Sequence, residues 1–128
     1  MIPNSGSYRL HLYISRRRTI IIGALGKFSF PGGHYVYSGS AMRNLSQRIE
    51  RHKRSTKKLH WHIDYLLADK YIKIQNIEVF NSIEREECSR NLALLNSGLY
   101  EAIVPGFGSS DCRNCPAHLL RRIDAIKR

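Results

Sequence analysis

Hydrophobic and polar residues alternate near the start of the chain. Residues 7–14 follow a period of two and are rich in aromatic and branched side chains, which predicts a half-buried strand. Tyr8, Leu10, Leu12 and Ile14 would share its apolar face. The first predicted element is therefore a strand that packs one side against the core.

Two further short strands are predicted before the first helix. Residues 16–18 form a basic turn, and residues 19–22 form an apolar strand that ends at Gly23, which predicts a hairpin with the first strand. The Phe-Pro-Gly-Gly stretch at 30–33 is typical of a turn, and residues 34–37 then predict a third strand. We therefore expect a mainly antiparallel sheet.

The remaining chain mixes helical spacing with one more alternating segment. The predicted elements are a basic amphipathic helix over 43–54, a short helix over 60–67, a strand over 72–80, a helix over 83–97 with a buried stripe of Cys88, Leu92 and Leu95 and a stop at Gly98, and a last helix over 117–127. The pattern predicts one α/β (α+β) domain over residues 1–128, with a small, mainly antiparallel sheet flanked by helices.

Charge is concentrated in the first half of the chain. The formal net charge is +11, and residues 1–64 hold 12 Lys or Arg against two acidic residues, Glu50 and Asp64. A polyanion such as nucleic acid is the expected partner, because cations that neutralise phosphates release counterions. A solvated basic face is the alternative, and charge alone identifies no chemistry. No apolar run is long enough to span a bilayer and no signal peptide is recognisable, so we expect a cytoplasmic protein.

Candidate chemistry is concentrated around the first helix. Asn44, Arg48 and His52 lie four residues apart and share a helix face, and Tyr37 comes just before the helix. A phenol, a guanidinium and an imidazole can activate water and stabilise charge on a phosphodiester. Basic helices also carry arginines that simply face solvent, so spacing alone does not decide between the two interpretations.

Motifs spread over the chain carry a family resemblance. Gly6-Ser7-Tyr8, Tyr37-Ser38-Gly39, Asn44 and Arg48 resemble the core of the GIY-YIG endonuclease superfamily, although Ser7 and Ser38 stand where Ile is usual. A closer resemblance is to a GIY-YIG-like family of the DUF123 type, found alone or fused to endonuclease III-type glycosylases. The motifs that carry it are Tyr-Val-Tyr-Ser-Gly-Ser-Ala at 35–41, Arg51-His52, His-Trp-His-Ile-Asp-Tyr-Leu at 60–66, Glu87-Cys88, and Phe-Gly-Ser-Ser-Asp-Cys at 107–112 with His118-Leu119.

The resemblance implies a catalytic set and a metal. Tyr8 would activate water, Tyr37 would bind phosphate, Arg48 would stabilise the attacked phosphate, and His52 would assist Arg48 or bind phosphate. Glu87 would be the ligand of Mg²⁺ or Mn²⁺, with Glu84 as the competing choice. Ordinary strand packing and a surface helix charge are the alternatives for the tyrosines and for Glu87.

A wider set of residues is expected to contact nucleic acid. Trp61 could stack on a base, although packing in the core is favoured, and Asp64 could orient one of the neighbouring imidazoles. The predicted nucleic-acid-binding residues are Arg43, Asn44, Arg51, Lys53, Arg54, Lys57, Lys58, His60 and His62.

The cysteines suggest a second site. Cys88, Cys112, Cys115 and His118 form the donor set of a structural Cys₃His zinc site. A Cys112–Cys115 disulfide is an alternative, and buried thiols without a metal are favoured over both. The tail motif identifies the family better than it identifies a function.

Taken with the resemblance, these features predict a metal-dependent endonuclease that hydrolyses DNA phosphodiester bonds in repair or processing. A repair glycosylase is an expected protein partner, and a monomer is the default state. The alternatives are a non-catalytic nucleic-acid-binding accessory module and an RNA-directed nuclease.

Overall fold

The computed structural model describes residues 2–54, 57–108 and 115–123. A five-stranded antiparallel sheet has the strand order β5-β1-β4-β7-β6, and β2 and β3 form a separate two-stranded sheet. The elements are, in chain order, β1 Gly6–Ile14, β2 Arg18–Ile22, the 3₁₀ helix η1 Gly23–Leu25, β3 Gly26–Phe30, β4 Gly33–Ala41, α1 Leu45–Lys53, α2 His62–Leu67, β5 Ile72–Asn81, α3 Glu87–Asn96, β6 Tyr100–Ala102 and β7 Leu119–Arg122. The predicted α+β class and the antiparallel sheet flanked by helices are confirmed.

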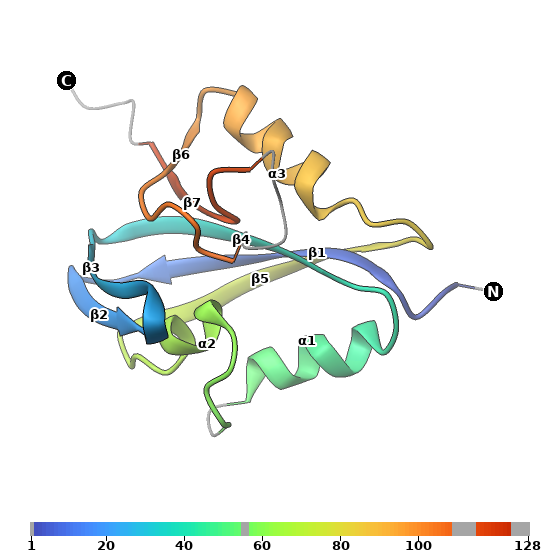
Figure 1. Ribbon diagram of the computed structural model, residues 1–128, viewed down its shortest axis with the longest axis horizontal. Helices are drawn as coiled ribbons and strands as arrows, with labels where there is room; N and C mark the ends of the chain where they lie inside the picture. Colours follow the sequence, from blue (N-terminus) through green and yellow to red (C-terminus); the bar gives the residue numbers. More distant parts are fainter. Residues whose placement is uncertain (1, 55–56, 109–114, 124–128) are drawn as a thin grey trace.

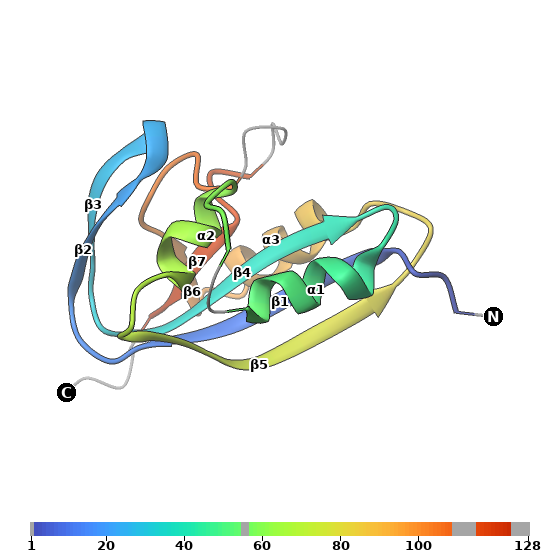
Figure 2. The ribbon, with the colours of Figure 1, turned by 90° about the horizontal axis from the view of Figure 1, so that it is seen from below.

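The helices lie on both sides of the main sheet. In Figure 1, α1 and α2 lie below the long strands and α3 lies above them, beside β6 and β7. Figure 2 shows the same arrangement from below, with the β2–β3 hairpin projecting at one end of the molecule. The two halves of the chain therefore meet at the central strands β1 and β4.

The apolar face of β1 forms the centre of the core. Tyr8, Leu10, Leu12 and Ile14 are each at most 2% exposed, as the alternating pattern predicts. These side chains belong to one core cluster with buried residues of α1 and α2, because packing the apolar faces of sheet and helices together removes them from water. Within the core, β1 lies between β4 and β5, so its position is fixed along both edges.

The predicted hairpin between the first strand and residues 19–22 is wrong. β2 pairs with β3, a strand over 26–30 that the pattern did not identify, while both edges of β1 are occupied by β4 and β5. The Arg16 to Arg18 turn therefore leads the chain out of the main sheet. Local alternation predicts a strand correctly but says nothing about which strand it pairs with.

The C-terminal helix predicted over 117–127 is also wrong in its described part. Residues 119–122 form β7, which inserts between β4 and β6, and residues 124–127 lie outside the described residues. Leu119 and Leu120 are both buried, which a strand in the interior of a sheet allows because its two faces are covered. Pairing with strands far away in the sequence therefore makes this segment a strand, although its apolar residues have helical spacing.

Helix α3 begins later than predicted, and its most buried residue is Asn91, which lies beside the predicted stripe. Cys88, Leu92 and Leu95 are half-buried, whereas Asn91 is fully buried and its Nδ2 donates a hydrogen bond of 2.6 Å to the Ala117 carbonyl. Gly98 follows the helix with φ +79°, as the predicted stop requires. Among the helices of the described segments, none combines the length and apolar content needed to cross a bilayer.

Candidate active site

Two tyrosines enter the site from the neighbouring strands β1 and β4. Tyr8 lies opposite Gly39, and a Cβ atom at position 39 would lie 2.6 Å from the Tyr8 ring. Tyr37 lies two residues before Gly39 on β4, and a Cβ atom at Gly108, which has φ +68°, would lie 2.9 Å from the Tyr37 ring. Glycine at positions 39 and 108 therefore leaves the space in which the two phenols sit.

Arg48 reaches the same place from α1. Its Nη1 donates a hydrogen bond of 3.1 Å to the Ser40 carbonyl, and its guanidinium lies 4.4 Å from the centre of the Trp61 ring. Arg51 lies 4.5 Å from the same ring. Trp61 is half-buried and its ring contacts two arginines, an arrangement that we call the platform. This agrees better with the predicted packing role than with a ring that is open for stacking on a base.

Asp64 anchors this platform. It is fully buried, accepts two hydrogen bonds from Arg51, and accepts the backbone N–H groups of His60 and Trp61. The Arg51 guanidinium and these N–H groups outweigh the effect of burial, so the pKa of Asp64 is lowered. The alternative in which Asp64 orients an imidazole is not the one observed, because its carboxylate caps α2 and binds Arg51.

Glu87 comes from the first turn of α3. Its side chain is 15% exposed, and its Oε1 is buried with no hydrogen-bond partner in the described part of the chain. Arg85 Nη1 lies 3.9 Å from Oε2, too far for a strong hydrogen bond. Glu84 is exposed and does not line the site, so the geometry favours Glu87 over Glu84 as a cation ligand.

These side chains line one pocket of about 270 Å³. Tyr8, Tyr37, Arg48 and Glu87, which the family resemblance singles out, all border it. The sequence predicted no role for Arg85, whereas base stacking was an alternative for Trp61 and metal binding an alternative for His118. Trp61 and His118 both belong to motifs that carried the resemblance. The full lining is Tyr8, Tyr37, Ser38, Gly39, Ser40, Ala41, Met42, Arg48, Trp61, Arg85, Glu87, Gly108 and His118.

His52 lies behind the pocket. Its Nε2 is 2.8 Å from the Tyr8 hydroxyl oxygen, and its side chain is only 2% exposed. Burial lowers the pKa of His52 to about 4, so its imidazole is neutral at pH 7. The buried ring of His52 is not accessible to a phosphate, so the predicted phosphate-binding role does not fit. The other predicted role, assistance to a neighbouring side chain, remains, and the side chain that His52 contacts is Tyr8.

Burial also changes the pKa values of the two phenols. It raises the pKa of Tyr8 to about 12, while the nearby Arg48 guanidinium acts in the opposite direction. The pKa of Tyr37 is raised further, first by burial and then by Tyr8. Both phenols are therefore protonated at neutral pH and can donate hydrogen bonds.

The predicted nucleic-acid-binding residues fall into two groups. Arg51, Lys57 and His62 have internal partners: Lys57 Nζ donates to the carbonyls of Arg51 and His52, and His62 Nδ1 accepts the Gly108 N–H at 2.8 Å. Burial lowers the pKa values of both Lys57 and His62. The exposed group, which stays available for an anionic ligand, is Arg43, Asn44, Lys53, Arg54, Lys58 and His60.

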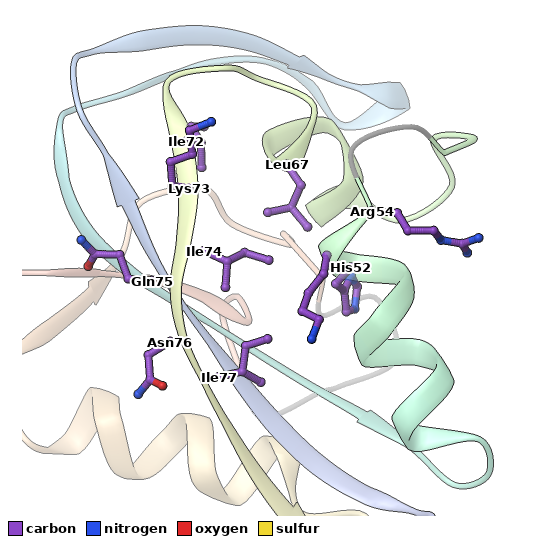
Figure 3. A pocket seen from close by; sticks show the side chains of 10 residues that line it. His52, Arg54, Leu67, Ile72, Lys73, Ile74, Gln75, Asn76 and Ile77 are labelled. Atoms are coloured by element: carbon purple, nitrogen blue, oxygen red, sulfur yellow. The ribbon is translucent and has the colours of Figure 1, made fainter.

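A second hollow, which we call the α1–β5 groove, lies beyond His52. Its volume is about 430 Å³, and Figure 3 shows Ile74 and Ile77 pointing from β5 toward His52 on α1. Lys53, Arg54 and Lys73 supply its charge, and no carboxylate occurs among its described lining residues. Lys73 was not predicted as part of a binding surface because it lies on a separate strand.

The cysteine prediction is resolved in part. Cys115 carries a free, buried thiol, which excludes the Cys112–Cys115 disulfide considered as an alternative, and Cys112 lies outside the described residues. Cys88, Cys115 and His118 gather their donor atoms within 4.8 Å of one another. Burial lowers the pKa of His118, which keeps a lone pair on its neutral ring.

No curated protein and no solved structure matches this chain. A family model described as a domain of unknown function, DUF123, matches residues 7–127 and therefore includes every residue of the pocket. The match extends over both sheets and over the three α-helices found among the described residues. The chain belongs to the DUF123 family.

Proposed function

We propose that the protein is a divalent-metal-dependent endonuclease of the GIY-YIG type that hydrolyses DNA phosphodiester bonds in repair or processing. The observation that carries this proposal is the convergence of four side chains on one pocket from four elements, namely Tyr8 of β1, Tyr37 of β4, Arg48 of α1 and Glu87 of α3. A phenol pair, a permanent cation and a carboxylate are the groups that metal-assisted phosphodiester hydrolysis uses.

Glu87 fits the role of metal ligand. Its Oε1 is buried and lacks a hydrogen-bond partner among the described residues, a costly arrangement that a cation would relieve. Mg²⁺ is commonly bound by one or two carboxylates together with water and substrate phosphate oxygens. When bound, the ion would polarise the phosphate and stabilise the leaving oxygen.

The other side chains of the pocket have separate roles in the proposed reaction. Tyr8 first gives its hydroxyl proton to His52 Nε2, which lies 2.8 Å from the hydroxyl oxygen, and the resulting phenolate then accepts a proton from the attacking water. Arg48, whose positive charge favours the phenolate of Tyr8, donates to a non-bridging phosphate oxygen. Tyr37 donates a hydrogen bond from its hydroxyl group to a second phosphate oxygen.

The exposed basic residues would position the nucleic acid. Arg43 and Asn44 lie next to the pocket at the start of α1, and Lys53 and Arg54 lie at its end. The α1–β5 groove, with three cations on its rim, offers a second place for backbone phosphates. A cytoplasmic location, a monomeric state and a repair glycosylase as partner remain predictions.

The decisive experiment is cleavage of labelled single-stranded, duplex, flap and abasic DNA in Mg²⁺, Mn²⁺ or EDTA. We expect metal-dependent cleavage by wild type and by Glu84→Gln, and loss of cleavage in Glu87→Gln and Arg48→Ala. Glu84 is a matched control because it is an exposed glutamate three residues from Glu87.

Two outcomes would redirect the proposal. Salt-sensitive binding without cleavage of any substrate would support a non-catalytic accessory module instead. Faster cleavage of RNA than of DNA of the same structure would support an RNA-directed nuclease, because the 2′-hydroxyl distinguishes the two.

A further inference from the structure

A cluster of sulfur and nitrogen donors lies between α3 and the segment before β7. Cys88 Sγ is 3.5 Å from His118 Nε2, and the Cys115 thiol donates to the Cys88 carbonyl at 3.6 Å. Figure 1 shows the segment that leads into β7 beside α3. We call Cys88, Cys115 and His118 the thiol cluster.

The segment that carries two of the three donors is held firmly before any ion arrives. The His118 N–H donates to the Phe107 carbonyl at 2.7 Å, and the His118 carbonyl accepts the Ser38 N–H at 2.9 Å. Asn91 donates to the Ala117 carbonyl from the middle of α3. These bonds fix the backbone around the cluster, which lowers the conformational cost of assembling a metal site.

The cluster is enclosed and its spacing is close to that of a metal site. Cys115 and His118 are 6% and 4% exposed, and Cys88 is half-buried. Ligand atoms around a tetrahedral zinc ion with bonds of about 2.0–2.3 Å lie about 3.3–3.8 Å apart. The donor atoms lie within 4.8 Å of one another, so they need to move about one ångström closer together to bind a zinc ion.

The donor type selects the ion. Two thiolates and an imidazole suit Zn²⁺, whereas Mg²⁺ prefers oxygen ligands. The cluster is thus chemically distinct from the carboxylate of Glu87, although Glu87 immediately precedes Cys88 in the chain. Water can supply the fourth ligand.

Cys88 is disulfide-bonded in the structure. A thiol reductant would convert this disulfide to two thiols and would itself be oxidised to its disulfide. Zn²⁺ would then displace one proton each from Cys88 and Cys115 and bind the resulting thiolates. The disulfide and the zinc site are therefore alternative states of the same cysteine.

We propose that Cys88, Cys115 and His118 bind a structural Zn²⁺ ion in the reduced protein. The ion joins the first turn of α3 to the segment before β7. Because Glu87 is the neighbour of Cys88, this link also holds its carboxylate at the pocket. The site is a structural one and its existence does not depend on the proposed nuclease activity.

The test measures metal content without measuring cleavage. Full-length protein is reduced with a phosphine, loaded with ZnSO₄, passed over a desalting column and analysed by inductively coupled plasma mass spectrometry. We expect about one zinc ion per chain in wild type and in Arg48→Ala and Glu87→Gln, and at least about tenfold less in Cys115→Ser and His118→Ala. A sample oxidised before loading should hold correspondingly little zinc.

A spectroscopic measurement covers the case in which a cluster variant fails to fold. Wild type loaded with Co²⁺ should show thiolate-to-cobalt charge-transfer absorption, which should disappear when Zn²⁺ is added. Absence of zinc from the reduced wild type, absence of the charge-transfer band, or loss of zinc in Glu87→Gln would each overturn the proposal. The last result would place the ion at the carboxylate instead.

Discussion

The pocket and the α1–β5 groove are built from the same helix but differ in how their side chains are held. Arg48 faces the pocket, where it contacts Ser40 and Trp61, whereas Lys53 and Arg54 of the groove are exposed. Burial shifts the pKa values of Tyr8, Tyr37 and His52 around the pocket. The groove offers exposed cations over an apolar floor. A preorganised site suits chemistry, and an open basic groove suits binding that depends on salt.

The largest expected effect comes from the support beneath the pocket. Asp64→Ala should lower the free energy of unfolding by about 3–5 kcal/mol, because Arg51 and two backbone N–H groups lose their buried partner. Urea unfolding followed by circular dichroism measures this. Glu50→Ala, which removes an exposed partner of Lys53, should stay close to wild type. Equal stability of the two variants would show that the platform does not depend on Asp64.

Arg48→Ala should reduce kcat by about 10²–10³, if the proposed reaction is correct, because it removes a preorganised donor to the phosphate. Lys53→Ala should leave kcat nearly unchanged and raise KM. Steady-state cleavage kinetics on one substrate compare the two. A similar loss of kcat in both variants would remove the distinction between pocket and groove.

His52 predicts a pH dependence of stability. Its folded pKa of about 4 is below the ordinary value of 6.5, so the unfolded state binds more protons between these values. Its contribution is therefore present above about pH 6.5 and falls as pH decreases, by about 3 kcal/mol at pH 4.

The measurement is the unfolding free energy of wild type and His52→Gln from pH 7 to pH 4. The difference between the two proteins should change in favour of the variant as pH falls, since glutamine does not titrate. Parallel curves would show that His52 is not the group responsible.

The smallest expected effect belongs to the groove. Lys73→Ala and Arg54→Ala should each lower the slope of log affinity against log salt by about 1, with little dependence on DNA sequence. Fluorescence anisotropy at several salt concentrations measures this slope, and Lys27→Ala on β3 serves as a basic control outside the groove. An unchanged slope in both groove variants would show that DNA does not use this surface.

The periodicity of the chain accounts for most of the local structure. The alternation in residues 7–14 and 72–80 correctly predicts β1 and β5, and the helical spacing in 43–54 and 60–67 correctly predicts α1 and α2. These segments carry a clear period because one face meets the core and the other meets solvent. The family motifs likewise identified four side chains that border the pocket.

The tertiary structure determined which strands pair and which buried side chains meet, and the local sequence pattern contains neither. β7 is a strand because β4 and β6 hold it on both edges, and β2 leaves the main sheet because β1 is already paired on both sides. Asp64 meets Arg51 rather than an imidazole for a similar reason, since the partner of a buried charge depends on how two helices pack. The sequence by itself thus determined which residue types were available and which faces were apolar. Only folding determined pairing, burial and the convergence of Tyr8, Arg48 and Glu87, because these depend on contacts between segments far apart in the chain.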